Sequence, residues 1–207
     1  MGKFLTSALL ALAVSCIGIW NPVPARAGIL DDVLSAPKTL IDRAIEARSS
    51  SDIIKDNEIV IKVNAIMAEL GTIKASTQIY EQRLLITGLF AEGETYRKFE
   101  KGVRAVEGVK KLYWHVTYMT DKAKDEAIAA GHMMDWKDVL AFETKAMARL
   151  IGTAGIADVN FRVTGDPFGN LCLMGRARSR EEMKKAISKL GEGDGVKKVY
   201  NYALVRP

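Results

Sequence analysis

Cysteine and histidine, the residues that most often form disulfides or hold metal ions, are almost absent from this sequence. Two cysteines, Cys16 and Cys172, and two histidines, His115 and His132, occur among the 207 residues. Neither histidine has a carboxylate or thiol at a ligand spacing, so no metal site is predicted. Cys16 lies in a segment that we expect to be removed, which leaves no pair for an intramolecular disulfide. Cys172 lies within an apolar run and is interpreted as a small buried hydrophobe.

Motifs that carry enzymatic chemistry are also missing. The chain contains no G-x-S-x-G, no H-E-x-x-H and no G-x-x-x-x-G-K-[ST] sequence. The glycine-rich segment 191–195 lies between an expected helix and an expected strand, which is typical of a helix end and turn rather than a phosphate cradle. We therefore predict a protein without enzymatic activity and without a cofactor.

The long uncharged apolar run, 4–20, is too short for a typical membrane-spanning helix of about 20 residues. It follows Lys3, and it precedes a proline-containing break and the small residues Ala25 and Ala27, which stand at positions −3 and −1 of a cut before Gly28. This order is typical of a secretory signal peptide. We expect residues 1–27 to be removed and the mature protein to be exported to the periplasm, with a possible association with the outer membrane.

An alternative for the N-terminus depends on Cys16. The sequence 13–16 loosely resembles a lipobox, in which Cys16 would become the lipidated first residue; an alanine stands where leucine is usual, so soluble secretion is favoured. Cleavage before Gly28 removes Lys3 and Arg26, and the formal charge falls by two, from +5 to +3. Export and this small positive charge argue against nucleic acid as a partner. They are compatible with an anionic surface.

What the sequence does contain is an internal repeat. The segment 84–88, an apolar run ending in glycine, returns as 171–175, and Gly-Val-Lys-Lys-aliphatic-Tyr at 108–113 returns as 195–200. A constant offset of 87 residues aligns both pairs without a gap, so we predict two copies of one small domain. We assign 52–118 to the first repeat and 134–207 to the second.

Periodicity predicts the same order of elements in both repeats. In the first, apolar residues at helical spacing from 59 to 70 follow Asp56, a plausible N-terminal cap, and two strands, a second helix and a third strand come next. The turn 165–169 is longer than its counterpart by about three residues. We predict an α+β fold of two tandem α-β-β-α-β domains, each a three-stranded sheet with both helices on one face.

Two further segments complete the predicted organisation. Residues 28–51 form an amphipathic helical lead-in, for which packing onto the next domain is favoured over membrane contact. Residues 119–133 are a charged connector between the repeats.

This order of elements, the strand ending in glycine and the Gly-Val start of the last strand resemble the BON domain (bacterial OsmY and nodulation). The helix 56–65 is similar to the opening helix of that family, and 144–151 is a weaker second version. Two such domains behind an export signal resemble periplasmic OsmY-like proteins and the dual-BON outer-membrane lipoprotein. The resemblance implies a non-enzymatic protein that binds anionic phospholipid and helps to keep the envelope intact under osmotic or other stress.

The resemblance also implies that lipid contact lies on the opening helix of the second repeat. In that helix Phe142, Lys145 and Arg149 are predicted to form an exposed stripe, in which an aromatic ring and two cations suit an anionic interface. Trp136 is a weaker candidate, because it falls nearer the core face. The predicted core face is a stripe of three residues with three flanking residues: Val139, Ala146 and Leu150, flanked by Leu140, Met147 and Ile151.

Two other interpretations remain open from the sequence. By default the basic stripe is an ordinary solvated helix face, and Phe142 could instead lie at the edge of the core or pack between the two domains. The protein as a whole could also be a protein–protein adaptor or accessory subunit of an envelope assembly, with lipid binding incidental. Glu143 does not fit the apolar stripe in which it falls.

Overall fold

The computed structural model describes residues 48–72 and 74–206, which all fall within one compact unit, Ser35–Pro207. None of the helices in these ranges is both long enough and apolar enough to cross a bilayer. The predictions for Cys16, Ala25, Ala27 and Gly28, and for most of the lead-in, lie outside the described residues.

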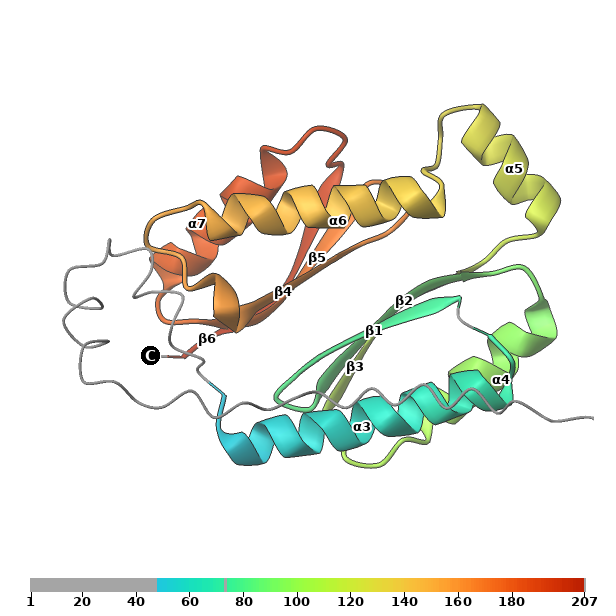
Figure 1. Cartoon of the computed structure of the whole chain (residues 1–207), viewed down its shortest axis with the longest axis horizontal. Helices are drawn as coiled ribbons and strands as arrows, with labels where there is room; N and C mark the ends of the chain where they lie inside the picture. The colour runs from blue at the N-terminus through green and yellow to red at the C-terminus, as the bar shows by residue number, and fades with distance from the viewer. Residues whose placement is uncertain (1–47, 73, 207) are drawn as a thin grey trace, which may run out of the picture. The chain divides into compact units, whose positions relative to one another are not determined.

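The first repeat, 50–118, has the predicted order helix, strand, strand, helix, strand (Figure 1). Its elements are α3 (Ser50–Glu69), β1 (Ala75–Tyr80), β2 (Arg83–Phe90), α4 (Gly93–Arg104) and β3 (Lys111–Tyr118). The sheet order is β1-β2-β3, with β1 antiparallel and β3 parallel to the central strand β2. Both helices cover one face of this sheet, because Ile59 and Val63 of α3 and Phe99 and Val103 of α4 share a core with Leu84.

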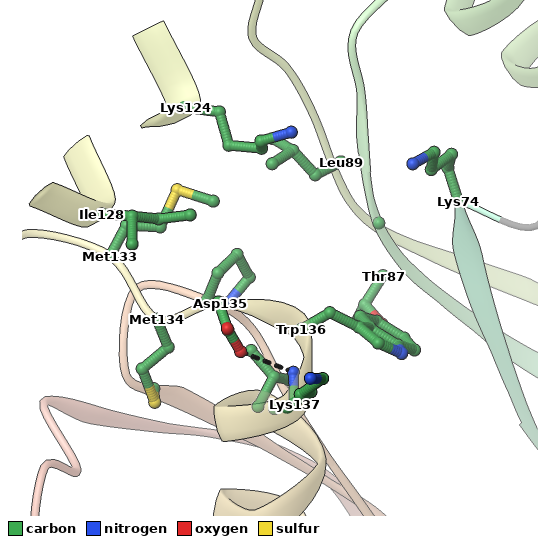
Figure 2. A pocket seen from close by; sticks show the side chains of 14 residues that line it. Lys74, Thr87, Leu89, Lys124, Ile128, Met133, Met134, Asp135, Trp136 and Lys137 are labelled. Carbon is green, nitrogen blue, oxygen red and sulfur yellow. Dashed lines mark hydrogen bonds between the residues drawn. The ribbon is translucent and has the colours of Figure 1, made fainter. Parts of the chain in front are cut away.

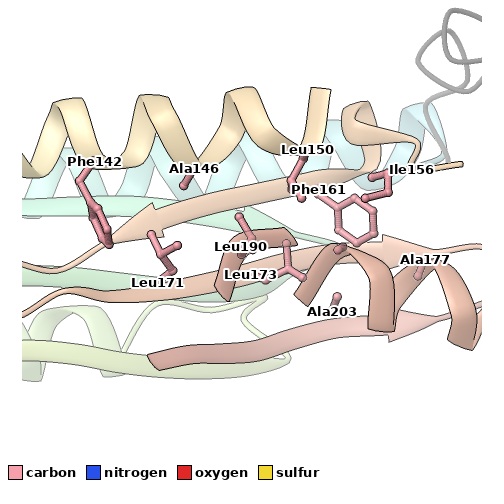
Figure 3. Close-up of a cluster of buried hydrophobic side chains, with 11 residues drawn as sticks. Phe142, Ala146, Leu150, Ile156, Phe161, Leu171, Leu173, Ala177, Leu190 and Ala203 are labelled. Carbon is pink, nitrogen blue, oxygen red and sulfur yellow. The ribbon is translucent and has the colours of Figure 1, made fainter. Parts of the chain in front are cut away.

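The second repeat, 136–205, follows a short helix and has the same order (Figure 1). Its elements are α6 (Trp136–Ile151), a 3-10 turn η1 (Asp158–Asn160), β4 (Phe161–Gly165), β5 (Asn170–Ala177), α7 (Arg180–Gly191) and β6 (Lys198–Val205). The sheet order β4-β5-β6 repeats the antiparallel and parallel pairings of the first sheet. Figure 3 shows the core between α6 and this sheet, in which Phe142 lies near Leu171 at one end and Leu150 lies near Phe161 at the other. The predicted α+β fold class is confirmed.

The registers of the two sheets repeat the offset seen in the sequence. Arg83 lies opposite Lys111 in the first sheet, and Asn170 lies opposite Lys198 in the second. Each residue of the second parallel pair is therefore 87 positions after its equivalent in the first. In the antiparallel pairs, Ala75 and Phe161 lie opposite the equivalent glycines 88 and 175, an offset of 86. The second hairpin therefore gains one residue relative to the first, not the three that the sequence predicted.

One local prediction was wrong, and one segment contains a helix that was not predicted. Asp56 does not cap the opening helix: α3 begins earlier, at Ser50, where the Ser49 hydroxyl accepts a hydrogen bond from the Asp52 N–H over 3.0 Å. Three serines in a row at 49–51 resemble a loop, but Ser49 is a favourable cap and the other two begin the helix. Inside the predicted connector, Asp121–Ala129 forms the helix α5, capped by Thr120.

Each sheet turns its second face, the one without helices, toward the other sheet. Alternate residues of the central strands explain this: Leu84 and Ile86 point into the core of the first repeat, whereas Leu85 joins a third buried cluster with Tyr80, Cys172 and Met174. Burial on both faces is the reason that β2 and β5 are continuous apolar runs. The two small cores thus share a common interior.

Aromatic residues of the edge strands complete this interior in a symmetrical way. Tyr113 stacks on Tyr202 with ring centroids 3.9 Å apart, and His115 meets Tyr200 edge-on at 4.8 Å. Tyr113 and Tyr200 are 87 residues apart, as are His115 and Tyr202. The Tyr113 position of the first repeat therefore contacts the second repeat's equivalent of His115, and the His115 position contacts the equivalent of Tyr113. Reciprocal contacts of this kind are the arrangement of a twofold interface, here within one chain.

Candidate lipid-binding surface

The opening helix of the second repeat, α6, begins at a strong capping residue. Asp135 is the N-cap, and its carboxylate accepts hydrogen bonds from the N–H groups of Lys137, over 2.7 Å, and Asp138, over 3.0 Å. This cap makes Trp136 the first residue of the helix and fixes which side chains face the sheet.

Phe142 lies in the core and not on an exposed stripe, so this prediction was wrong. Its side chain is only 6% exposed and packs with Ala146 and Leu150 above the second sheet (Figure 3). Val139, Ala146 and Leu150 are buried as predicted, and Phe142 extends their stripe by one helical neighbour. The core face is thus rotated away from Leu140, which is 57% exposed.

Glu143, which did not fit the apolar stripe, has a structural role. Its carboxylate accepts a hydrogen bond from the Thr164 hydroxyl over 2.6 Å and another from the Gly165 N–H over 2.7 Å. These two bonds tie α6 to the end of β4. A polar residue at a core-facing position is satisfied in this way.

Arg149 also leaves the predicted stripe. It is half-buried, and its guanidinium lies against Gly193, where an added Cβ would collide with it. Lys145 is exposed, but Phe142 and Arg149 do not accompany it. The structure therefore does not bring the three residues of the predicted patch together.

A different pair of apolar side chains is exposed on α6. Trp136 is 67% exposed and Leu140 is 57% exposed, and their i, i+4 spacing places them on neighbouring turns of the same side of the helix. Lys137 and Lys145 are exposed on this helix as well. We call Trp136, Lys137 and Leu140 the outer face of α6. Trp136 was predicted to lie nearer the core face. This was wrong, as it was for Leu140, because the core face is rotated toward Phe142.

Side chains that commonly bind metals are scattered over the described part of the chain. Within 48–72 and 74–206, no three His, Cys, Asp or Glu residues are close enough to hold a metal ion. Cys172 is buried between the sheets, and this burial raises the pKa of its thiol to about 12, so the reactive thiolate is disfavoured. His115 lies among tyrosines, with its Nε2 2.6 Å from the Tyr202 hydroxyl.

Comparisons with known proteins bear on the second repeat most directly. A BON domain is found at residues 139–207, from the first turn of α6 to the end of the chain. Over 154 residues the chain is 26% identical to an uncharacterized protein in the gshII 5′ region of Anaplasma centrale, an alignment that covers 74% of this chain and 96% of that protein.

Two solved structures were also matched. CdsD, a structural protein of the type III secretion system of Chlamydia trachomatis, is 14% identical, with a TM-score of 0.27 over 72% of this chain and 93% of that chain. Its C-terminal domain is 14% identical, with a TM-score of 0.28 over 72% and 98%.

Proposed function

We propose that this protein is a non-enzymatic component of a bacterial envelope that binds anionic phospholipid through the outer face of α6. The BON domain at 139–207 supports an envelope-associated role, because the family is associated with phospholipid binding. We extend the proposal to a first repeat of BON type, to export to the periplasm after cleavage before Gly28, and to a contribution to envelope integrity under stress.

The exposed pair Trp136 and Leu140 is the observation that carries the proposal. A tryptophan that is 67% exposed and a leucine that is 57% exposed are unfavourable in water, and they become favourable when they enter the headgroup region of a bilayer. Lys137 is exposed between these two residues on the same helix, and a cation adds about 1 kcal/mol near an anionic surface. The first repeat offers no aromatic residue on the corresponding helix α3.

Vesicle co-sedimentation tests this proposal. The protein should sediment with phosphatidylglycerol vesicles, and less with rising salt, because screening weakens the attraction between lysines and lipid. Leu140→Asp should weaken retention about tenfold or more. The variant loses the burial of a leucine side chain in the bilayer, about 1.5–3 kcal/mol, and its new carboxylate is repelled by the anionic lipid. Equal retention by phosphatidylcholine vesicles, or retention by neither, would contradict the proposal.

Ile61→Asp is the matched control for this experiment. Ile61 is 66% exposed on α3, the helix that opens the first repeat, so it presents the same kind of side chain at a comparable exposure. The Ile61→Asp variant should be retained by phosphatidylglycerol vesicles as well as the wild-type protein is. An equal loss for the two variants would show that vesicles bind exposed apolar side chains in general.

A second candidate function has its own observation. Ile54 and Ile61 are 59% and 66% exposed on α3 and lie two turns apart, on a helix that has no aromatic residue. A pair of this kind is compatible with a protein partner, which is the adaptor function that the sequence left open. An Ile61→Asp variant that loses a stoichiometric periplasmic partner, while wild-type protein binds no vesicles, would favour this alternative.

A further inference from the structure

A cavity of about 460 Å³ lies beside the first turn of α6 (Figure 2). Its walls come from five places in the chain: Lys74 just before β1, the end of β2, the helix α5 with the segment after it, the start of α6, and the end of β4 with the turn after it. Cavities that hold small molecules measure about 300–1,000 Å³, so this one has room for a single ligand of modest size.

The walls of the cavity are apolar. Leu89, Ile128, Met133 and Trp136 are among the apolar side chains that Figure 2 shows around the open space. Met133 is buried and Ile128 is half-buried, so these two belong to the protein interior rather than to a solvated surface. Methionine adapts its shape to irregular hydrocarbon. This lining suits a hydrocarbon chain better than a sugar or a nucleotide, which need convergent polar groups.

The charged side chains around the cavity are mainly cationic. Lys74, Lys124 and Lys137 line it, against one carboxylate, that of Asp135. The Asp135 carboxylate already accepts the two N–H groups that start α6, one of which is the dashed contact in Figure 2. Lys124 pairs with Asp121 over 2.8 Å, whereas Lys74 and Lys137 form no salt bridge with any residue in 48–72 or 74–206.

We infer that this cavity binds one single-chain anionic amphiphile, a fatty acid, with its hydrocarbon among Leu89, Ile128 and Met133 and its carboxylate near Lys74 and Lys137. The inference rests on the proposed lipid-binding function and names a ligand for it. Trp136 belongs both to the cavity wall and to the outer face of α6, so the cavity begins where the protein is proposed to touch the bilayer. Fatty acid released within a membrane would reach it there.

Calorimetric titration of the full chain with oleate, below its micelle concentration, tests the inference. Oleate should bind with one-to-one stoichiometry, and 1-monooleoylglycerol, which has the same chain and a neutral head, should bind about tenfold more weakly because it forfeits the two lysine contacts. Equal affinity for both amphiphiles, or a stoichiometry well above one, would overturn the inference.

Filling the cavity gives the decisive variant. Ile128→Trp should abolish oleate binding but leave retention by phosphatidylglycerol vesicles intact, because Ile128 is not on the outer face of α6. Ile54→Trp is the matched control, since Ile54 is an isoleucine on another helix, 59% exposed and outside the cavity. Equal oleate affinity in the two variants would overturn the inference.

Further variants keep the outcomes separate. Leu140→Asp should lose vesicle binding and keep oleate binding; loss of both would place oleate on the outer face and overturn the cavity assignment alone. If Ile128→Trp is unfolded by circular dichroism, Lys74→Glu should weaken oleate about tenfold and leave 1-monooleoylglycerol unchanged, with Lys62→Glu on α3 as its control. Oleate binding without vesicle binding would contradict the proposed function and support the cavity.

Discussion

In each repeat a carboxylate on the opening helix holds the neighbouring hairpin, but Asp56 and Glu143 do so in different ways. The two residues are 87 positions apart, the offset of the repeat. Asp56 is 1% exposed and accepts the N–H groups of Glu81 and Gln82, over 3.0 and 2.6 Å, while Glu143 is half-buried and binds Thr164 and Gly165.

The turns explain this difference. Glu81 and Gln82 form a two-residue turn with φ values of 52° and 60°, a left-handed conformation that residues with a Cβ adopt only at a cost. The buried carboxylate of Asp56 offsets that strain. The second turn is one residue longer and has its own support, because the Asp166 carboxylate accepts the N–H groups of Phe168 and Asn170. The carboxylate on the opening helix therefore contributes more to stability in the first repeat, where the turn is less stable by itself.

Replacing the two carboxylates measures this difference and has the largest expected effect. Asp56→Ala should lower the free energy of unfolding by about 3–5 kcal/mol, because it strands two buried N–H groups and breaks the pair with Arg48 at 3.1 Å. Glu143→Ala should lower it by about 1–3 kcal/mol. Urea titration followed by circular dichroism supplies both values. Glu58→Ala, at an exposed position of α3, should stay within about 0.5 kcal/mol, and equal losses at 56 and 143 would contradict the comparison.

The repeated glycines of the central strands give the next largest effect. A Cβ on Gly175 would collide with the backbone of Asn160, and its φ of 129° is unsuited to other residues. A Cβ on Gly88 would lie 2.6 Å from the Lys74 carbonyl oxygen, without a positive φ. Gly175→Ala should therefore lower the free energy of unfolding by about 2–4 kcal/mol and Gly88→Ala by about 1–3 kcal/mol. Thermal unfolding of the two variants measures the order, and a reversed order would contradict it.

The sequence predicted the fold well because the repeat fixes it twice. The strand β2 with Gly88 and its copy β5 with Gly175 have the same register to their parallel neighbours, and the apolar stripes through Ile59 and Leu150 define the same helix face. An offset within one chain compares two versions of each element, so an ambiguous segment in one repeat is resolved by the other.

The candidate site was predicted poorly, and α6 shows why. Phe142, Glu143 and Leu140 lie within four residues, where a rotation of the helix by a fraction of a turn exchanges core and surface. Glu143 could be placed only once its partners Thr164 and Gly165 were known. The equivalence of Glu143 with Asp56 was present in the sequence as the offset of 87, and it was the signal that could have fixed the rotation. The cavity was not predictable, because its walls come from segments that periodicity treats separately.

The two aromatic contacts between the sheets also differ between the repeats, and the expected effect on stability is smaller. Tyr113 and Tyr202 stack at 3.9 Å, and the reciprocal contact of His115 with Tyr200 is 4.8 Å and edge-on. A double-mutant cycle of Tyr113→Ala and Tyr202→Ala should yield a coupling of about 0.5–1.5 kcal/mol in the free energy of unfolding. The cycle of His115→Ala and Tyr200→Ala should give less. Zero coupling for the tyrosine pair would show that the sheets do not depend on this contact.

The last difference between the repeats is chemical, because His115 occupies the position that Tyr202 occupies in the copy. Burial lowers the pKa of His115 below 6.5, and Lys198 lowers it further, although Asp166 acts in the opposite direction. Burial raises the pKa of Tyr202 to about 12, so that residue does not titrate near neutral pH. Only the first repeat therefore introduces a proton-linked group into the space between the sheets at this position.

The depressed pKa of His115 sets the direction of a pH effect. The unfolded chain takes up the proton near pH 6.5, whereas the folded chain resists it, so stability falls as the pH drops below about 6.5 and stops falling below the folded pKa. The effect is small, because His115 is only half-buried and solvent screens part of the interaction. Unfolding midpoints in urea at about pH 7.5 and about pH 5.5 measure it. The difference in unfolding midpoint between the two pH values should be smaller for His115→Gln than for wild-type protein. His132→Gln, at an exposed position, should keep the wild-type difference. An unchanged difference in His115→Gln would assign the pH dependence to other groups.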